Sequence, residues 1–147
     1  MKKSNLKKLF IPLALVLFAT ANFSCSNTRR SIGVEEGWDL LGEMKVNFVR
    51  DRDALEVRNS NKYTAIRFKI ENKDVRLNNL TVYYVNGDKL SPAVDDEIPA
   101  GQMSRVIELA ADGKVISKID FKYRSKGNIF KGRASVLVFG KRYYQGY

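Results

Sequence analysis

Two short acidic runs contain the first residues of this sequence that could do chemistry. In the first run, Asp51, Asp53 and the nearby Glu56 could offer carboxylates to Ca²⁺, which binds about six to eight oxygen atoms. However, Arg52 separates the two aspartates, and no glycine supplies the sharp turn of a calcium loop. We interpret the run as a polar connection with a local ion pair, and we predict no metal site.

The second acidic run, Asp95, Asp96 and Glu97, could take part in glycoside hydrolysis. That reaction needs two carboxyl groups about 5 to 10 Å apart across a substrate cleft. Neighbouring residues of an extended chain point in opposite directions, so a distant partner such as Asp53 or Asp120 would be required. A carboxylate-dependent glycoside hydrolase, or a similar hydrolase, is the alternative function. A solvated loop is the simpler interpretation of the run.

The residue counts exclude most other catalytic sites. The chain has no histidine, and Cys25 is its single cysteine. A Ser-His-Asp triad, a Cys-His pair, a zinc cluster of cysteine and histidine, and an intrachain disulfide are therefore ruled out by count. The sequence predicts no catalytic residue and no cofactor, and it favours a protein that is not an enzyme.

The main charge feature is the basic C-terminal quarter of the chain. The formal net charge is +10, and residues 113–147 alone hold nine basic residues and one acidic residue. Such a segment favours anionic partners, although the same side chains could simply solvate strand faces. Arg105 and Arg124 could clamp a carboxylate or phosphate if both pointed into one concavity. The candidate binding residues are Arg105, Lys122, Arg124, Lys131, Arg133, Tyr143, Tyr144 and Tyr147.

The N-terminus has the pattern of an export signal. Residues 1–8 carry four lysines and no acidic residue, and residues 9–21 are uncharged. This apolar run is shorter than the ~20 residues that a transmembrane helix needs. We therefore predict a signal peptide over residues 1–24.

The end of this segment resembles a bacterial lipobox, in which a cysteine is lipidated and becomes the mature N-terminus. Ser24 and Cys25 match that motif, whereas Asn22 and Phe23 depart from it. A lone exposed thiol is also a liability in an oxidising compartment, and acylation removes it. We expect an outer-membrane lipoprotein of a Gram-negative cell envelope, anchored in the lipid bilayer through Cys25. Cleavage after Ala21 would instead give a soluble periplasmic or secreted protein.

Alternating apolar and polar residues predict that the rest of the chain is built from β-strands. Residues 25–36 read as the lipidated cysteine and a flexible tether, and residues 37–147 as a single domain. Residues 115–123 alternate with period 2 and are expected to pair with residues 105–110 in a hairpin. Residues 64–71 show the clearest pattern, with one face in the core and one in solvent. Further strands are expected at residues 44–48, 55–57, 80–85, 89–94 and 134–139.

Turn signals separate these strands. Asn86 and Gly87 predict a hairpin with a type I′ turn, and breaks are expected at residues 51–53, 72–74 and 95–97. Residues 80–85 are dense in β-branched and aromatic side chains, so we expect a strand covered on both faces. About eight short strands with turns every 8 to 12 residues predict an all-β fold, an antiparallel, jelly-roll-like β-sandwich.

Five short segments carry a resemblance to a known family. Residues 38–42, 51–53, 98–101, 105–109 and 121–124 read Trp-Asp-Leu-Leu-Gly, Asp-Arg-Asp, Ile-Pro-Ala-Gly, Arg-Val-Ile-Glu-Leu and Phe-Lys-Tyr-Arg. This combination is similar to a family of small secreted bacterial β-sandwich proteins of unassigned function. The similarity covers most of residues 37–140 and transfers no catalytic residue. It implies an all-β fold and a location in the cell envelope.

These features predict a non-enzymatic module of the cell envelope that acts by binding or by structural contact. The expected partners are the lipid bilayer, through Cys25, and an anionic polysaccharide or another envelope protein. A glycan-binding role depends on the basic residues 113–147. Nucleic acid is not an expected partner, because the chain is exported.

Overall fold

The computed structural model describes residues 35–46, 52–125 and 133–144, and for Arg124 and Ser125 only the backbone. These residues form nine β-strands, all antiparallel, and no helix. The predicted antiparallel β-sandwich is confirmed, with nine strands where about eight were expected. The strands are β1 Trp38–Val46, β2 Arg52–Glu56, β3 Lys62–Glu71, β4 Val75–Tyr84, β5 Lys89–Leu90, β6 Asp96–Ile98, β7 Ile107–Glu108, β8 Lys114–Ser125 and β9 Ala134–Arg142.

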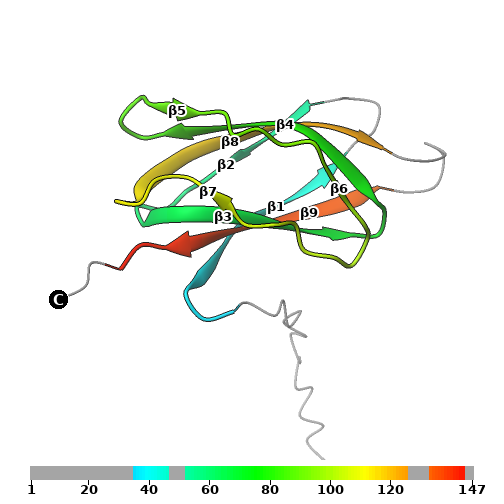
Figure 1. Cartoon of the computed structure of the whole chain (residues 1–147), viewed down its shortest axis with the longest axis horizontal. Coiled ribbons are helices and arrows are strands. Elements are labelled where there is room, and N and C mark those ends of the chain that lie inside the picture. The colour runs from blue at the N-terminus through cyan, green and yellow to red at the C-terminus, as the bar shows by residue number, and fades with distance from the viewer. Residues whose placement is uncertain (1–34, 47–51, 126–132, 145–147) are drawn as a thin grey trace, which may run out of the picture. The chain divides into compact units, whose positions relative to one another are not determined.

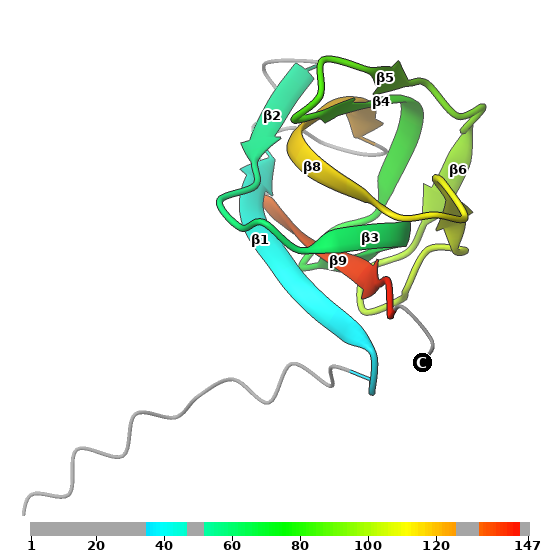
Figure 2. The same ribbon diagram turned by 90° about the vertical axis from the view of Figure 1, so that its left-hand side faces the viewer.

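The strands lie in two layers (Figure 1). One layer contains β1, β9, β3 and β7, and the other contains β2, β8, β4, β5 and β6. The layers belong to one continuous sheet because the start of β3 pairs with the start of β8, with Lys62 opposite Val115 and Tyr63 opposite Lys114. Beyond this junction β8 leaves β3 and pairs with β2 (Figure 2).

Alternate residues of both layers point into a shared core. Ile66, Phe68 and Ile70 of β3 and Ile119 and Phe121 of β8 are all at most 3% exposed. The rings of Phe68 and Phe121 meet edge to face, with centroids 5.3 Å apart. Burial of such side chains is the main force that joins the layers, at about 25 cal/mol per Å² of apolar surface. The predicted core side is therefore confirmed from Ile66 to Ile70, whereas Thr64 is only partly buried beside a register shift.

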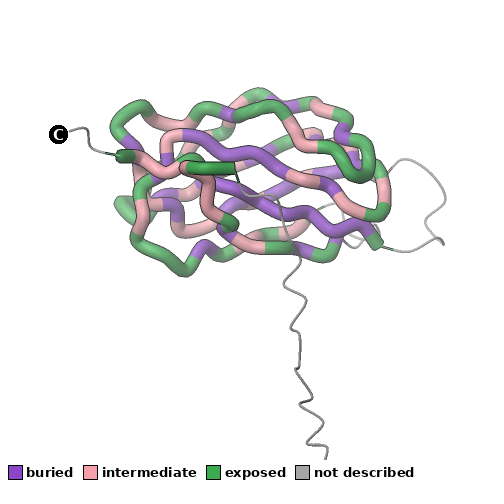
Figure 3. Tube along the Cα trace, turned by 90° about the horizontal axis from the view of Figure 1, so that it is seen from below, coloured by how far each residue is buried: buried purple, intermediate pink, exposed green. Residues whose placement is uncertain are grey.

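The opposite side of β3 differs from the prediction of a solvated face. Arg67 is only 8% exposed, because the Trp38 ring covers it with its centroid 4.1 Å from the guanidinium carbon. The neighbouring strand β9 is buried from Ala134 to Gly140 (Figure 3). Alternation along β3 alone could not indicate this, because the covering ring comes from β1.

The expected hairpin between residues 105–110 and 115–123 is wrong. The earlier segment forms only the two residues of β7, which pair with β3, and the Leu109 amide donates to the Thr64 carbonyl at 2.8 Å. β8 pairs instead with β4 over most of its length. The ten-residue strand β4 offers β8 a long alternating apolar side, whereas β7 offers the buried side chain of Ile107 alone. The longer partner buries more apolar surface.

Several predicted strand boundaries are also wrong. The expected breaks at residues 51–53 and 95–97 contain parts of β2 and β6, and β4 begins at Val75, five residues earlier than expected. Polar residues in these strands lie at edges or on outer faces, where pairing does not force them out of water. Conversely, only Lys89 and Leu90 of the expected strand 89–94 pair with β4.

A bulge changes which β8 residues face the core. Tyr83 lies opposite Lys118 but Tyr84 lies opposite Ile116, so one residue of β8 is passed over. Ile116 is therefore buried, whereas uninterrupted alternation predicts Val115 on the core side. An extra residue of this kind reverses the direction of the side chains that follow it along the strand.

The hairpin between β4 and β5 is confirmed, but its turn is of another type. Gly87 has a φ of 90°, whereas Asn86 does not have a positive φ. The Gly87 amide donates to the Tyr84 carbonyl at 3.1 Å, and the Tyr84 amide donates to the Asp88 carbonyl at 2.9 Å. This is a three-residue loop with a type I turn and a glycine bulge. A type I′ turn would require positive φ at both residues, so that prediction is wrong.

Candidate functional site

The outer face of β2, β8 and β4 carries three rows of side chains that run across the sheet. Residues opposite one another on neighbouring strands point to the same side, so the pairing register defines the rows. From one end of the face to the other, the rows are Arg52, Lys122 and Asn79; Ala54, Asp120 and Thr81; and Glu56, Lys118 and Tyr83.

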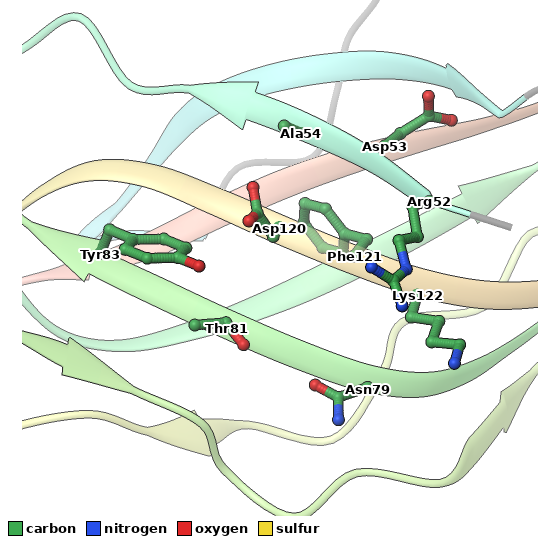
Figure 4. A pocket seen from close by; sticks show the side chains of 9 residues that line it. All are labelled: Arg52, Asp53, Ala54, Asn79, Thr81, Tyr83, Asp120, Phe121 and Lys122. Atoms are coloured by element: carbon green, nitrogen blue, oxygen red, sulfur yellow. The ribbon is translucent and has the colours of Figure 1, made fainter. Parts of the chain in front are cut away.

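An open depression with a volume of about 480 Å³ lies over this face (Figure 4). Ala54 and Thr81 flank Asp120 with short side chains, while longer side chains stand in the rows on either side. The face is therefore hollowed at its middle row. The three side chains of the first row, Arg52, Lys122 and Asn79, all line this depression.

Two cations stand directly opposite each other at one end of the depression. Arg52 and Lys122 are Cα partners in the register, and Asn79 lies on the other side of Lys122. Like charges in this position destabilise a sheet. Within the described residues, no carboxylate forms an ion pair with either cation. A guanidinium, an ammonium and an amide thus form a set of donors that could bind one anionic group.

The other end of the face is neutral and partly aromatic. The Lys118 ammonium lies 3.1 Å from Asp120 Oδ1 and 4.3 Å from the centroid of the Tyr83 ring. At the β4 edge, the hydroxyl oxygens of Thr81 and Ser91 are 3.0 Å apart and hydrogen-bonded. The middle row and this end together thus offer hydroxyl, carboxylate and ring surface.

Asp53 and Asp120, the two candidate distant partners for the acidic run at residues 95–97, point to opposite faces of the sheet. Asp53 is the register partner of Phe121, which points into the core, whereas Asp120 points outward. The Asp53 carboxylate accepts a hydrogen bond from the buried hydroxyl of Tyr123. Among the described residues, no group of three acidic, cysteine or histidine side chains is placed to hold a metal ion.

The predicted binding residues are spread over different parts of the molecule. Lys122 lines the depression, but Arg105 lies in the loop between β6 and β7. There its Nε donates to Asp96 at 2.9 Å and its Nη2 donates to the Ala93 carbonyl at 2.8 Å. Arg105 borders a second open depression of about 440 Å³, which meets the first at Asn79. An acidic partner already neutralises Arg105 in that position.

The remaining predicted residues belong to the β9 end or lie outside the described residues. Arg133 is exposed just before β9, and Tyr143 follows β9, where its amide donates to the Lys62 carbonyl at 2.9 Å. Tyr144 is 65% exposed. The Arg124 backbone belongs to β8, and nothing is described of its side chain. Outside the described residues lie Cys25, Lys131 and Tyr147.

Acidic residues from other segments neutralise part of the basic C-terminal quarter. The Lys114 ammonium donates to Asp88 Oδ2 at 2.8 Å, and this hydrogen bond lowers the pKa of Asp88 and raises the pKa of Lys114. Arg142 is also paired with an acidic residue from another segment, since its Nη2 lies 2.8 Å from Asp39 Oδ2. The net charge of residues 113–147 therefore overstates the free positive charge on the surface.

Arg142 completes a closed cluster in the other layer. Its Nε and Nη2 donate to the Asp39 carboxylate at 3.0 and 2.8 Å, and the Tyr63 hydroxyl donates to the same group at 3.0 Å. Burial raises the pKa of Asp39, but the hydrogen bonds from Arg142 and Tyr63 outweigh it, so this pKa is lowered overall. The pKa of Tyr63 is raised, mainly by burial. Because these groups satisfy one another, the cluster holds β1, β3 and β9 together.

Sequence reasoning selects Lys122 as a binding residue but misses the other polar and aromatic contributors to the binding surface, among them Arg52, Asn79, Thr81 and Tyr83. The first lies in a segment interpreted as a break, and the last two lie in a strand expected to be covered on both faces. Residues 52–56 carry only a weak signal, because Leu55 is apolar at one inward position but Asp53 occupies the other. The outward position of Lys118, Asp120 and Lys122 is the part of the site that alternation predicts.

Comparisons with known proteins place the chain in a family. The solved structure of AlgX from Pseudomonas aeruginosa is similar at 10% identity, with a TM-score of 0.45. That match covers 68% of this chain and 26% of the AlgX chain, so this chain spans about a quarter of the other protein.

A search among curated proteins finds no match. In the described residues, no helix is long and apolar enough to cross a membrane. The model of a domain of unknown function, DUF2541, matches residues 11–140. The resemblance to a family of unassigned function is confirmed to that extent, and the chain belongs to the DUF2541 family.

Proposed function

We propose that the chain is a non-enzymatic binding module of the bacterial cell envelope, anchored by lipid at Cys25, that holds an anionic glycan on the outer face of β2, β8 and β4. The observation that carries the proposal is the opposed pair Arg52 and Lys122, which no described carboxylate neutralises. A bound carboxylate or phosphate would turn this unfavourable pair into two charge-assisted hydrogen bonds.

The shape and chemistry of the face favour a chain of linked sugars over a small ion. Lys122 and Lys118 are four residues apart on β8, so the outer rows are separated by about 13 Å. Between them, Thr81 and Asp120 can donate to or accept from hydroxyl groups. The Tyr83 ring supplies apolar surface that could contact a sugar ring. An acidic polysaccharide carries the groups that match this face, namely anionic groups, hydroxyl groups and sugar rings.

The proposal is tested by calorimetric titration of the mature protein with a uronate-rich polysaccharide and with a neutral polysaccharide of similar length. We expect the acidic polymer to bind more tightly. Its affinity should fall as salt rises, because the Debye length shortens from about 30 Å at 0.01 M to about 8 Å at 0.15 M. Equal affinity for both polymers, or no effect of salt, would contradict the proposal.

Variants distinguish this face from the general positive charge of the protein. Arg52→Gln combined with Lys122→Gln should remove most of the affinity, because both donors for the anion are lost. Lys141→Gln is the matched control, since Lys141 is exposed on β9 in the other layer. A comparable loss from Lys141→Gln would show that the polymer follows net charge only and would refute a site at the depression.

The anchor is tested separately by mass spectrometry of the mature protein from the membrane fraction. We expect an acylated N-terminal Cys25. An unmodified thiol would refute the anchor and leave the glycan site to be judged by the titration alone.

A further inference from the structure

The outer face of the other layer carries an exposed apolar patch at the point where the described chain begins. Three side chains form it, and we call Trp38, Leu40 and Tyr144 the aromatic patch. Leu40 is 40% exposed and Tyr144 is 65% exposed. A Cβ atom on Gly37 would lie 4.0 Å from Tyr144 Cε2, so this ring stands beside the start of β1. Exposed apolar groups that gather in this way commonly mark a contact surface.

The patch has a firm base. The Trp38 ring stacks on Arg67, whose Nη1 donates to Glu35 at 3.2 Å, while its Nε and Nη2 are buried without a described partner. A buried cation gains from an aromatic face when it lacks hydrogen-bond partners. The Arg142 amide also donates to the Gly37 carbonyl at 2.8 Å. These contacts fix residues 35–38 against β3 and β9.

The patch lies within reach of the proposed lipid anchor. Glu35 contacts Arg67 on this face and stands ten residues after Cys25 in the sequence. Ten residues of extended chain span at most about 35 Å. An anchored cysteine would therefore keep the patch at high effective concentration near the bilayer, where even weak lipid contacts are occupied. Trp and Tyr suit that boundary because each has an apolar ring and a polar group.

We propose that the aromatic patch rests on the lipid bilayer, so that β1, β9 and β3 face the membrane and the depression on β2, β8 and β4 faces away from it. This inference rests on the lipid anchor of the proposed function. Lys141 is exposed opposite Trp38, but Glu36 is exposed two residues before Trp38 and offsets that charge. The contact thus depends on apolar groups, suits zwitterionic headgroups and is insensitive to salt, unlike glycan binding.

Trp38 is the only tryptophan of the chain, so its fluorescence reports on the patch directly. The acylated mature protein is reconstituted into phosphatidylcholine vesicles, with or without lipids brominated near the headgroup. We expect bromine to quench Trp38 emission at low and at high salt. Leu40→Ser combined with Tyr144→Ser should lose most of that quenching, because the ring moves away from the lipid.

The control variant is Val85→Ser, because Val85 is 67% exposed but lies after β4 in the other layer. It should leave the quenching unchanged. If Cys25 is acylated and the wild type is not quenched, or the patch variant is quenched as strongly as the wild type, the docking proposal is wrong and the anchor stands. An unmodified Cys25 overturns both, while the glycan titration remains an independent result.

Discussion

Arg142 and Arg52 carry the same positive charge, but the groups around them differ. Arg142 donates to Asp39, which Tyr63 also contacts, so this charge is fully used within the fold. Arg52 faces Lys122 across the sheet without a described carboxylate partner. The comparison teaches that net charge says little about binding, because only the second site retains capacity for an external anion.

Gly140→Ala should give the largest loss of stability, because it disturbs the packing of Tyr63. Together with Arg142 and Asp39, Tyr63 forms the closed cluster, which we call the closed site. A Cβ atom on Gly140 would lie 2.6 Å from Tyr63 Cδ1, and Tyr63 is fully buried, so its ring cannot move aside easily. Overpacking of this kind costs about 1 to 3 kcal/mol. Urea unfolding should show a lower midpoint, and an unchanged midpoint would mean that the Tyr63 ring is free to shift.

Arg142→Gln should destabilise the fold by less than Gly140→Ala does, because Asp39 loses its charged donors at a site that water partly screens. Glycan affinity measured on the folded variant should be unchanged. The comparison fails if this variant binds as weakly as Arg52→Gln, since the closed site would then contribute to ligand binding.

Acid should weaken the closed site selectively. The folded pKa of Asp39 is lowered below its ordinary value of 3.8, so its stabilising contribution is present above that value and is lost as the pH falls through the folded pKa. The difference in unfolding free energy between the wild type and Asp39→Asn should therefore be largest near pH 7 and shrink below about pH 4. A difference that is constant from pH 7 to pH 3 would exclude this ionisation as its source.

Lys122→Glu should give the smallest change in stability and one of opposite sign. It replaces a like-charge pair with an opposite-charge pair across β2 and β8, which favours the folded state by about 0.2 to 1 kcal/mol. Binding of the acidic polysaccharide should be lost at the same time. A destabilised variant would show that Arg52 and Lys122 do not repel each other in the free protein.

The sequence predicts the fold class because alternation is a local property. Ile66, Phe68 and Ile70 mark a core side without any knowledge of the partner strands. The pairing of β8 could not be predicted in this way, because it depends on competition between β4 and the segment that contains β7. Long-range pairing is decided by the total surface that each arrangement buries.

The candidate site shows the same limit. Alternation places Lys122 on an outer face, but only the register brings Arg52 opposite it from a segment that reads as a break. Arg67 is the converse case. Its position in β3 predicts that it is exposed to solvent, but the Trp38 ring covers it. In both cases the decisive neighbour comes from another strand.

The narrow junction between the layers has a mechanical consequence. Only Lys62 and Tyr63 of β3 pair with β8, and on the opposite side β1 and β2 are in contact through Gly42 and Leu55. A pulling force applied between residue 35 and the outer face of β8 enters through β1 and reaches the other layer through these two narrow contacts and the core between them. Under load the two layers should separate first at the short pairing of β3 with β8. The long pairings of β9 with β1 and β3, and of β4 with β8, should stay intact.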